Sequence, residues 1–141
     1  MDSLERFIEA QEGTYQLAYR ELEEGEKQSH WMWFIFPQIQ GLGFSEISKF
    51  YAIKDREEAE AYYKHPILGR RLVEISRVLM DTESTDAETV MGSLVDAIKL
   101  KSSMTLFDEV SKDPIFSSVL DKFFGGSRDI RTLKLLEEQA I

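Results

Sequence analysis

The sequence predicts an all-α protein, a compact single-domain bundle of about seven or eight short-to-medium helices. Apolar residues return along most of the chain at the three- and four-residue spacing of amphipathic helices. Helix-capping residues, prolines and glycines divide the chain into segments of helical length, and signals typical of strands do not recur. The chain of 141 residues has the usual length of one domain, so we expect residues 1–141 to form one helical unit.

Residues 2–25 are predicted to form the first helical segment. Asp2 and Glu5 have the spacing of a capping box, in which side chains satisfy free backbone amides of the first turn. Apolar residues follow at helical spacing. Gly13 weakens the helix by about 1 kcal/mol relative to alanine and can break it. Gly25 ends the segment.

The stretch KQSHWMWFIFPQIQGLG (27–43) contains six consecutive apolar residues. We predict a short helix that begins at Ser29 and is ended by Pro37, because the residue before a proline is held outside the helical region. A helix that is apolar on every side has to be surrounded by other helices, which places this one at the centre of the fold. A buried strand is the alternative, since periodicity cannot distinguish the two structures in so short a run.

Capping residues and prolines predict where the remaining helices begin. His65 is expected to cap the helix that follows it, and a long helix is expected from about Ser93 to Lys112. Gly92 and the pair Gly125-Gly126 mark helix ends. The expected first residues, or the caps next to them, are Ser45, Asp55, Pro66, Thr85, Ser93, Asp113 and Asp129.

The composition excludes several classes of function. The formal net charge is −9 and no basic cluster is longer than Arg70-Arg71, so the chain is a poor general binder of nucleic acid. Without cysteine there is no disulfide, no thiolate nucleophile and no zinc–thiolate site. Only His30 and His65 could supply imidazole ligands. We expect no metal and no cofactor.

No segment is predicted to cross a membrane or to direct secretion. The longest apolar run has six residues, whereas a membrane-spanning helix needs about 20. The first residues, MDSLERFIEA, are acidic and amphipathic and lack the cationic and apolar regions of a signal peptide. We therefore expect a cytoplasmic protein without a membrane partner. The sequence gives no indication of its oligomeric state.

The segment GSLVDAIKLKSSMTLF (92–107) has the most informative pattern. On a helix, Asp96, Lys99 and Ser103 lie within about 60° of one another, on the face that also carries Leu100 and Phe107. Burying an acid, a base and a hydroxyl without partners costs several kcal/mol. These three groups are therefore expected to pair with one another, with other buried polar groups or with a ligand.

Two interpretations of this cluster are open. In the first, Asp96 and Lys99 form an internal ion pair that joins neighbouring helices, and Ser103 donates a hydrogen bond to the Lys99 carbonyl. In the second, Lys99 binds an anionic group in a pocket and Asp96 acts as a base or accepts a sugar hydroxyl. A Lys99–Ser103 nucleophilic dyad is less favoured, because activating the serine needs a strongly desolvated lysine and Asp96 keeps the lysine charged.

The aromatic run and its flanks supply further candidates. Trp31 and Trp33 are more typical of a core than of a cofactor-binding floor, and His30 fits an exposed first turn and a site equally well. Gln38 and the loop at residues 41–43 could present donors to an anion at a helix N-terminus, although a simple turn explains the glycines better. Glu21, with the glutamates that follow it, is expected on a solvated face.

These motifs resemble those of an uncharacterised all-α family of bacterial and fungal proteins that is often mislabelled calpastatin. The resemblance runs almost end to end and includes F-I-E-A-Q (7–11), E-L-E-E-G-E-K-Q-S-H-W-M-W-F-I-F-P-Q (21–38), A-Y-Y-K-H-P-I-L-G-R-R-L (61–72), D-A-I-K-L-K-S-S-M-T-L-F (96–107) and F-G-G-S-R-D-I-R-T-L (124–133). It implies a compact helical fold and no established activity. Protease inhibition by an extended, disordered chain conflicts with these capped, aromatic-rich segments, and we reject it.

Two hypotheses about function follow. In the first, polar groups converge over an aromatic floor and bind an anionic small molecule of nucleotide or sugar-phosphate type. The residues of this hypothetical site are His30, Trp31, Trp33, Gln38, Asp96, Lys99 and Ser103. If a reaction takes place there, hydrolysis with Asp96 or His30 as the catalytic general base is the simplest one. In the second, the protein is a non-catalytic protein-interaction module whose polar cluster only fixes the packing of its helices. The sequence does not decide whether the protein is an enzyme.

Overall fold

The computed structural model describes residues 4–139, and over this range the chain is all-α, as the sequence predicts. The described residues form ten helices: α1 (Glu5–Gln11), α2 (Tyr15–Glu23), α3 (Met32–Ile35), α4 (Glu46–Tyr51), α5 (Arg56–Lys64), α6 (Leu68–Asp81), α7 (Ala87–Met91), α8 (Leu94–Ser111), α9 (Pro114–Phe124) and α10 (Ile130–Gln139). The segment predicted at residues 2–25 forms two helices, α1 and α2, which accounts for part of the difference from the predicted seven or eight. The short helices α3, α4 and α7, of 4, 6 and 5 residues, are all at predicted positions.

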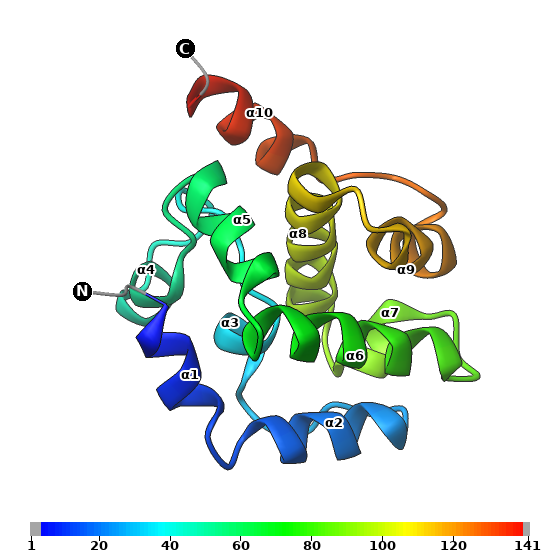
Figure 1. The fold of residues 1–141 in the computed structure, drawn as a ribbon. Coiled ribbons are helices and arrows are strands. Elements are labelled where there is room, and N and C mark those ends of the chain that lie inside the picture. Colours follow the sequence, from blue (N-terminus) through cyan, green and yellow to red (C-terminus); the bar gives the residue numbers. More distant parts are fainter. Residues whose placement is uncertain (1–3, 140–141) are drawn as a thin grey trace.

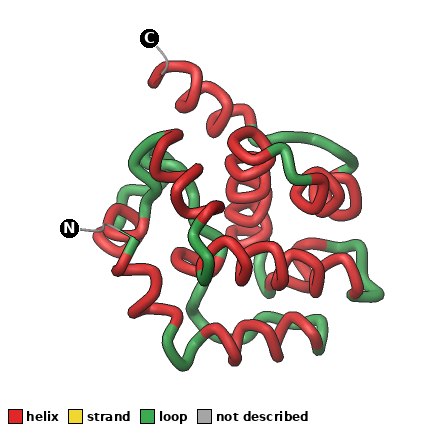
Figure 2. Tube along the Cα trace, viewed as in Figure 1, coloured by secondary structure: helices red, strands yellow, loops and turns green. Residues whose placement is uncertain are grey.

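The longest helix, α8, organises the fold. It stands upright near the centre of Figure 1 and contacts α5, α7, α9 and α10. Helix α6 runs across the front of this view and contacts α2, α5 and α9. The loops, green in Figure 2, are longest on either side of α3, at residues 24–31 and 36–45. Both long loops therefore begin or end at the aromatic run.

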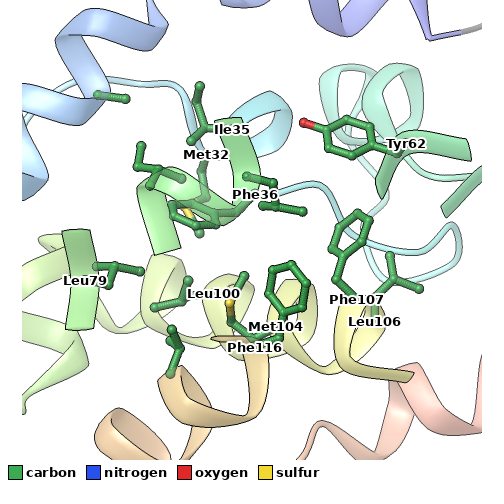
Figure 3. Packing of buried hydrophobic residues seen from close by; sticks show 14 of the residues in the cluster. Met32, Ile35, Phe36, Tyr62, Leu79, Leu100, Met104, Leu106, Phe107 and Phe116 are labelled. Carbon is green, nitrogen blue, oxygen red and sulfur yellow. The ribbon is translucent and has the colours of Figure 1, made fainter. Parts of the chain in front are cut away.

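Helix α3 supplies the centre of the hydrophobic core. Figure 3 shows Met32, Ile35 and Phe36 among core side chains from α5, α8 and α9. The core aromatic rings pack at tilted or edge-on angles, with the Phe107 ring centroid 5.4 Å from that of Tyr62 and the two planes 43° apart. Most of the aromatic run is therefore core, in a helical conformation, and the buried-strand alternative is wrong.

Several predicted caps are confirmed. Ser45, Asp55 and Ser93 each accept a hydrogen bond from the amide three residues later, at 3.2, 2.9 and 3.1 Å. His65 Nδ1 accepts hydrogen bonds from the amides of residues 67 and 68, at 3.1 and 3.2 Å, so that it caps α6 as expected. Asp113 caps α9 through the amide of residue 115, at 3.0 Å.

Other boundaries differ from the prediction. Gly13 (φ +76°) does break the first segment, into α1 and α2, whereas the predicted cap Asp2 lies outside the described residues. Helix α3 begins at Met32 and not at Ser29, because the Glu21 side chain binds the backbone amide of Ser29 and draws it out of the helix. Helix α6 begins two residues after the expected first residue, and α7 is capped by Asp86, one residue after the expected cap.

The segment from Ile39 to Ile53 leaves the bundle and returns to it. An isolated parallel bridge joins these two residues, with the Gln40 amide donating to the Ile53 carbonyl at 2.8 Å. Between them lies α4, which has no buried residue. It is held to the bundle by packing of its last residue, Tyr51, on Phe34 and Phe7, and by hydrogen bonds from Arg6 to the carbonyls of residues 50 and 52, each at 2.8 Å. No helix within residues 4–139 is long and apolar enough to cross a membrane.

Candidate functional site

A pocket of about 630 Å³ lies between the α3–α4 segment and the first half of α8. Much of its lining is apolar, and this part includes Trp33, Leu42, Phe44, Tyr51, Val95 and Ile98. Polar groups from several elements converge on the same space and include Gln38, Lys49, Lys99, Ser102, Asp129 and Arg131. An apolar pocket with a few convergent polar groups is typical of a small-molecule site.

Lys99 and Trp33 form the wall of the pocket where α8 faces α3. The Lys99 Nζ lies 4.1 Å from the centroid of the half-buried Trp33 ring. The negative face of the aromatic ring attracts the ammonium group, which holds this long and otherwise mobile side chain at the wall of the pocket. The sequence hypothesis had placed both residues in one site, and the structure brings them together.

Asp96 joins Lys99 to a second lysine, Lys27, which spacing within one helix does not reveal. Its carboxylate lies 3.5 Å from Lys99 Nζ, which confirms the expected ion pair, and 2.8 Å from Nζ of the buried Lys27. Lys27 also donates a 2.6 Å hydrogen bond to the Ser29 carbonyl. Because one carboxylate is shared between two ammonium groups, this cluster retains a positive charge on the side where Lys99 lines the pocket.

Trp31, the other tryptophan, lies behind this wall in the core and is not part of the pocket lining. Its indole Nε1 donates a 3.0 Å hydrogen bond to Glu21, so Glu21 is buried and not on the solvated face that we expected. Burial by itself raises the pKa of Glu21. Hydrogen bonds from the Ser29 hydroxyl, the amides of Gln28 and Ser29 and the Trp31 indole reverse this effect and lower the pKa to about 2.

The structure does not bring every candidate to the pocket. His30 is exposed and does not line it. Ser103 is fully buried beyond the lining, and within the described residues its hydroxyl has no hydrogen-bond partner, so the expected bond to the Lys99 carbonyl is absent. Its neighbour Ser102 lines the pocket instead, and its single hydroxyl proton is shared between the Ile98 carbonyl and the Asp129 carboxylate, each 3.2 Å from Oγ. Gln38 lies in the lining as hypothesised.

The end of the chain contributes residues that spacing within one helix could not reveal. Asp129 accepts hydrogen bonds from the Thr132 amide at 3.0 Å and from Ser102 Oγ at 3.2 Å, so it caps α10 and fixes that helix beside α8. Arg131, two residues later, donates to the Gly41 carbonyl at 3.3 Å. The sequence indicated Asp129 as the start of a helix. No local sequence pattern predicted that Arg131 would lie next to residue 41.

Positive charge therefore gathers in this pocket of an acidic protein. Three cationic side chains and one carboxylate line it, although the whole chain carries a net charge of −9. The carboxylate, Asp129, is already occupied by hydrogen bonds. Among the described residues, no group of three or more His, Cys, Asp or Glu is placed to hold a metal ion. The arrangement suits an anion that also has an apolar part.

Comparisons with known proteins agree with the fold and do not name a ligand. The crystal structure of the conserved hypothetical protein Rv1873 from Mycobacterium tuberculosis is similar to this chain, with 41% sequence identity and a TM-score of 0.91. The match covers 95% of this chain and 96% of that chain. No curated protein matches. The family model described as "Protein of unknown function (DUF1810)" matches residues 1–136, and this chain therefore belongs to that family.

Proposed function

We propose that the pocket between α3, α4 and α8 binds a small anionic molecule that also carries a flat ring, as a nucleotide does. The observation that carries this proposal is the position of Lys99, whose Nζ lies 4.1 Å from the centroid of the Trp33 ring in the pocket lining. The ammonium group is held in place before any ligand arrives, which reduces the entropy lost on binding.

The charge of the lining supports an anionic ligand. Lys49 and Arg131 are exposed side chains at the margin of the pocket, and Lys99 is half-buried at its wall. Asp96 neutralises only part of the charge of Lys99, since it also pairs with Lys27 at 2.8 Å. A phosphate or carboxylate group between these cations would form charge-assisted hydrogen bonds, which are about twice as strong as neutral ones.

The apolar lining favours a nucleotide over a sugar phosphate. Phe44, Tyr51 and Ile98 line the pocket together with Trp33. Covering such surface gains about 25 cal/mol for each Å² removed from water, and a base ring can cover it, whereas a sugar with its hydroxyl groups cannot. Both ligand classes were compatible with the sequence, and the lining supports the one with the ring.

We propose binding and do not extend the proposal to hydrolysis. A general base has to lie within hydrogen-bond reach of the attacking water in the site. His30 is exposed and outside the lining, and the Asp96 carboxylate is held by Lys27 at 2.8 Å. Neither group is therefore positioned for the proton transfer that the sequence hypothesis gave it.

Three probes that share parts of one structure test the proposal. AMP has both a ring and a phosphate, adenosine lacks the phosphate, and ribose 5-phosphate lacks the ring. Isothermal titration calorimetry is expected to detect AMP and to give at least a tenfold weaker Kd for each of the two partial probes. AMP at about 100 times its Kd should also stabilise the protein by about 2.7 kcal/mol, a shift of a few degrees in Tm.

Lysine variants on one helix locate the binding. Lys99→Met should weaken AMP binding about tenfold and leave adenosine binding unchanged, because methionine keeps most of the length of the side chain and removes the ammonium group. Lys101→Met, on the same helix but outside the lining, should change neither. Equal effects of the two variants, or AMP and adenosine binding alike, would contradict the proposed site.

A non-catalytic interaction module is the second candidate, and one observation favours it. Large apolar side chains around the pocket are exposed, including Phe44 at 80% and Val95 at 62%. An exposed apolar patch with a polar margin is typical of a protein-binding surface. Failure of AMP, adenosine and ribose 5-phosphate to bind would favour this candidate, with the Lys27–Asp96–Lys99 cluster then serving only to fix the packing of α8.

A further inference from the structure

The outer face of α6 carries four charged residues in a regular order. Arg70, Glu74, Arg77 and Asp81 follow one another at steps of four, three and four, and all of them are exposed. They line a shallow groove that also contains Tyr63. Figure 1 shows α6 running across the front of the molecule, where no other helix is drawn over it.

These four side chains do not neutralise one another within the helix. In the part of the chain that the structure describes, none of them lies within ion-pair distance of an opposite charge. The Glu74 carboxylate accepts a hydrogen bond from the Tyr15 hydroxyl and makes no ion pair with Arg77. For the other two neighbouring pairs the order explains the lack of pairing, because a basic residue four positions before an acidic one is the less favourable arrangement within a helix. Arg70 precedes Glu74 in this way, and Arg77 precedes Asp81.

The order of the charges is self-complementary between two antiparallel copies of α6. A two-fold axis that passes midway between residues 75 and 76 places Arg70 opposite Asp81 of the second copy. The same axis places Glu74 opposite Arg77 of the second copy. In a two-fold interface each contact occurs twice, so that all eight charges would meet an opposite charge at the same height along the helices.

We propose that two copies of this chain form a two-fold symmetric dimer in which the outer faces of α6 pack antiparallel. The charges fix the register, since sliding one helix by a turn would bring like charges together. The half-buried Tyr63 and Val73 in the groove supply apolar contact area. No residue of α6 lines the pocket at α8, so the dimer does not depend on the proposed function.

Charge reversal of the outer pair tests the dimer. Arg70 and Asp81 are exposed, and the structure assigns neither side chain a hydrogen bond or an ion pair. Burial lowers the pKa of Lys122, which donates to carbonyls at the end of α6, and the Asp81 carboxylate opposes this shift. Circular dichroism and thermal denaturation should therefore first establish that each variant is folded. In sedimentation equilibrium at low salt, Arg70→Glu and Asp81→Lys should each weaken the dimer at least about tenfold, because each creates two like-charge contacts. The double variant Arg70→Glu/Asp81→Lys restores both contacts and should dimerise about as well as the parent.

Mixing the two single variants gives the decisive result. In a heterodimer, Glu at position 70 of one chain meets Lys at position 81 of the other, and the unchanged Asp81 meets the unchanged Arg70. The mixture should therefore dimerise about as well as the parent, although each variant alone dimerises at least about tenfold more weakly. Lys134→Glu and Glu138→Lys, which make the same changes in net charge on α10, should leave dimerisation unaffected. A parent that stays monomeric up to about 200 µM at low salt, or a mixture without heterodimers, would overturn the proposal.

Discussion

Trp31 and Glu21 are joined by a buried 3.0 Å hydrogen bond from the indole to the carboxylate. The same carboxylate accepts hydrogen bonds from the amides of Gln28 and Ser29, at 2.8 and 3.0 Å. A buried ionised acid is tolerated only when its oxygens are satisfied in this way. The contact attaches the loop before α3 to α2. It therefore helps to fix the position of α3, whose Trp33 lines the pocket.

This contact predicts a loss of stability in acid. The pKa of Glu21 is about 2, below its ordinary value of 4.5, so the folded state favours the ionised form. The corresponding stabilisation, up to about 3 kcal/mol, is complete above pH 4.5 and is lost as the pH falls toward 2. Urea denaturation at pH 7 and pH 3 should show Glu21→Gln less stable than the parent mainly at pH 7.

Glu23→Gln, on the same helix but exposed, is the matched control and should not change the pH dependence. If parent and Glu21→Gln lose stability in parallel between pH 5 and pH 3, the Glu21 carboxylate is not the group responsible.

Two adjacent serines on α8 should respond in opposite ways to alanine. Ser103 Oγ is fully buried and, within the described residues, has no partner, so Ser103→Ala should stabilise the protein by about 1 kcal/mol. Ser102 Oγ donates to Asp129 at 3.2 Å, and Ser102→Ala should cost about 1 kcal/mol. Thermal denaturation of both variants measures the difference. Equal destabilisation by the two variants would mean that the Ser103 hydroxyl has a partner, such as a bound water.

Gly69 sets the distance between α5 and α6. A Cβ at this position would lie 1.8 Å from the carbonyl oxygen of Tyr63, which is backbone and cannot rotate away. Gly69→Ala should therefore cost about 3 kcal/mol in urea denaturation. Gly25→Ala is the control, because Gly25 has φ +85° but open space around its Cα, and should cost only about 1 kcal/mol from backbone strain. A cost at Gly69 no larger than that at Gly25 would mean that α5 and α6 move apart to accommodate the added Cβ.

The Lys99 ammonium should attract anions to Trp33 even without a ligand. Trp31 is fully buried, so quenching of tryptophan fluorescence by iodide reports mainly on the half-buried Trp33. Lys99→Met should lower the iodide quenching constant by up to about fivefold, since a charge about 4 Å away in water contributes about 1 kcal/mol. Quenching by neutral acrylamide should stay the same. A parallel fall with both quenchers would indicate changed access to Trp33, and no change with iodide would contradict the attraction.

The sequence predicted the fold well because its helix signals are local. Asp55 and Ser93 cap helices through amides three residues away, and glycines end them, so each boundary can be recognised within one turn. The boundaries that failed depend on distant contacts. Helix α3 starts late because of a carboxylate eight residues before Ser29, and no pattern within the aromatic run contains that information.

The candidate site was predicted only in part for the same reason. Helical spacing placed Asp96 and Lys99 on one face, and their ion pair is present. Spacing within α8 did not identify Lys27, which pairs with Asp96 across 69 positions of the chain. The angular positions of residues around α8 also favoured Ser103 over Ser102 as a site residue. Ser102 lines the pocket instead, where its hydroxyl contacts Asp129 at the start of α10. A contact with a residue far away in the sequence cannot be predicted from the spacing of residues within one helix.

The bridge between Ile39 and Ile53 has a consequence for how a ligand could enter and leave. The bridge brings the two ends of this chain segment together, so that residues 40–52 form a closed loop. The helix within this loop, α4, has no buried residue. The contacts that oppose its displacement are the packing of Tyr51 on Phe7 and Phe34 and the hydrogen bonds from Arg6. They are fewer than those of a core helix, so this segment should open at a lower free energy than the core. Exchange between bulk water and the interior of the pocket could then proceed while the rest of the molecule stays folded.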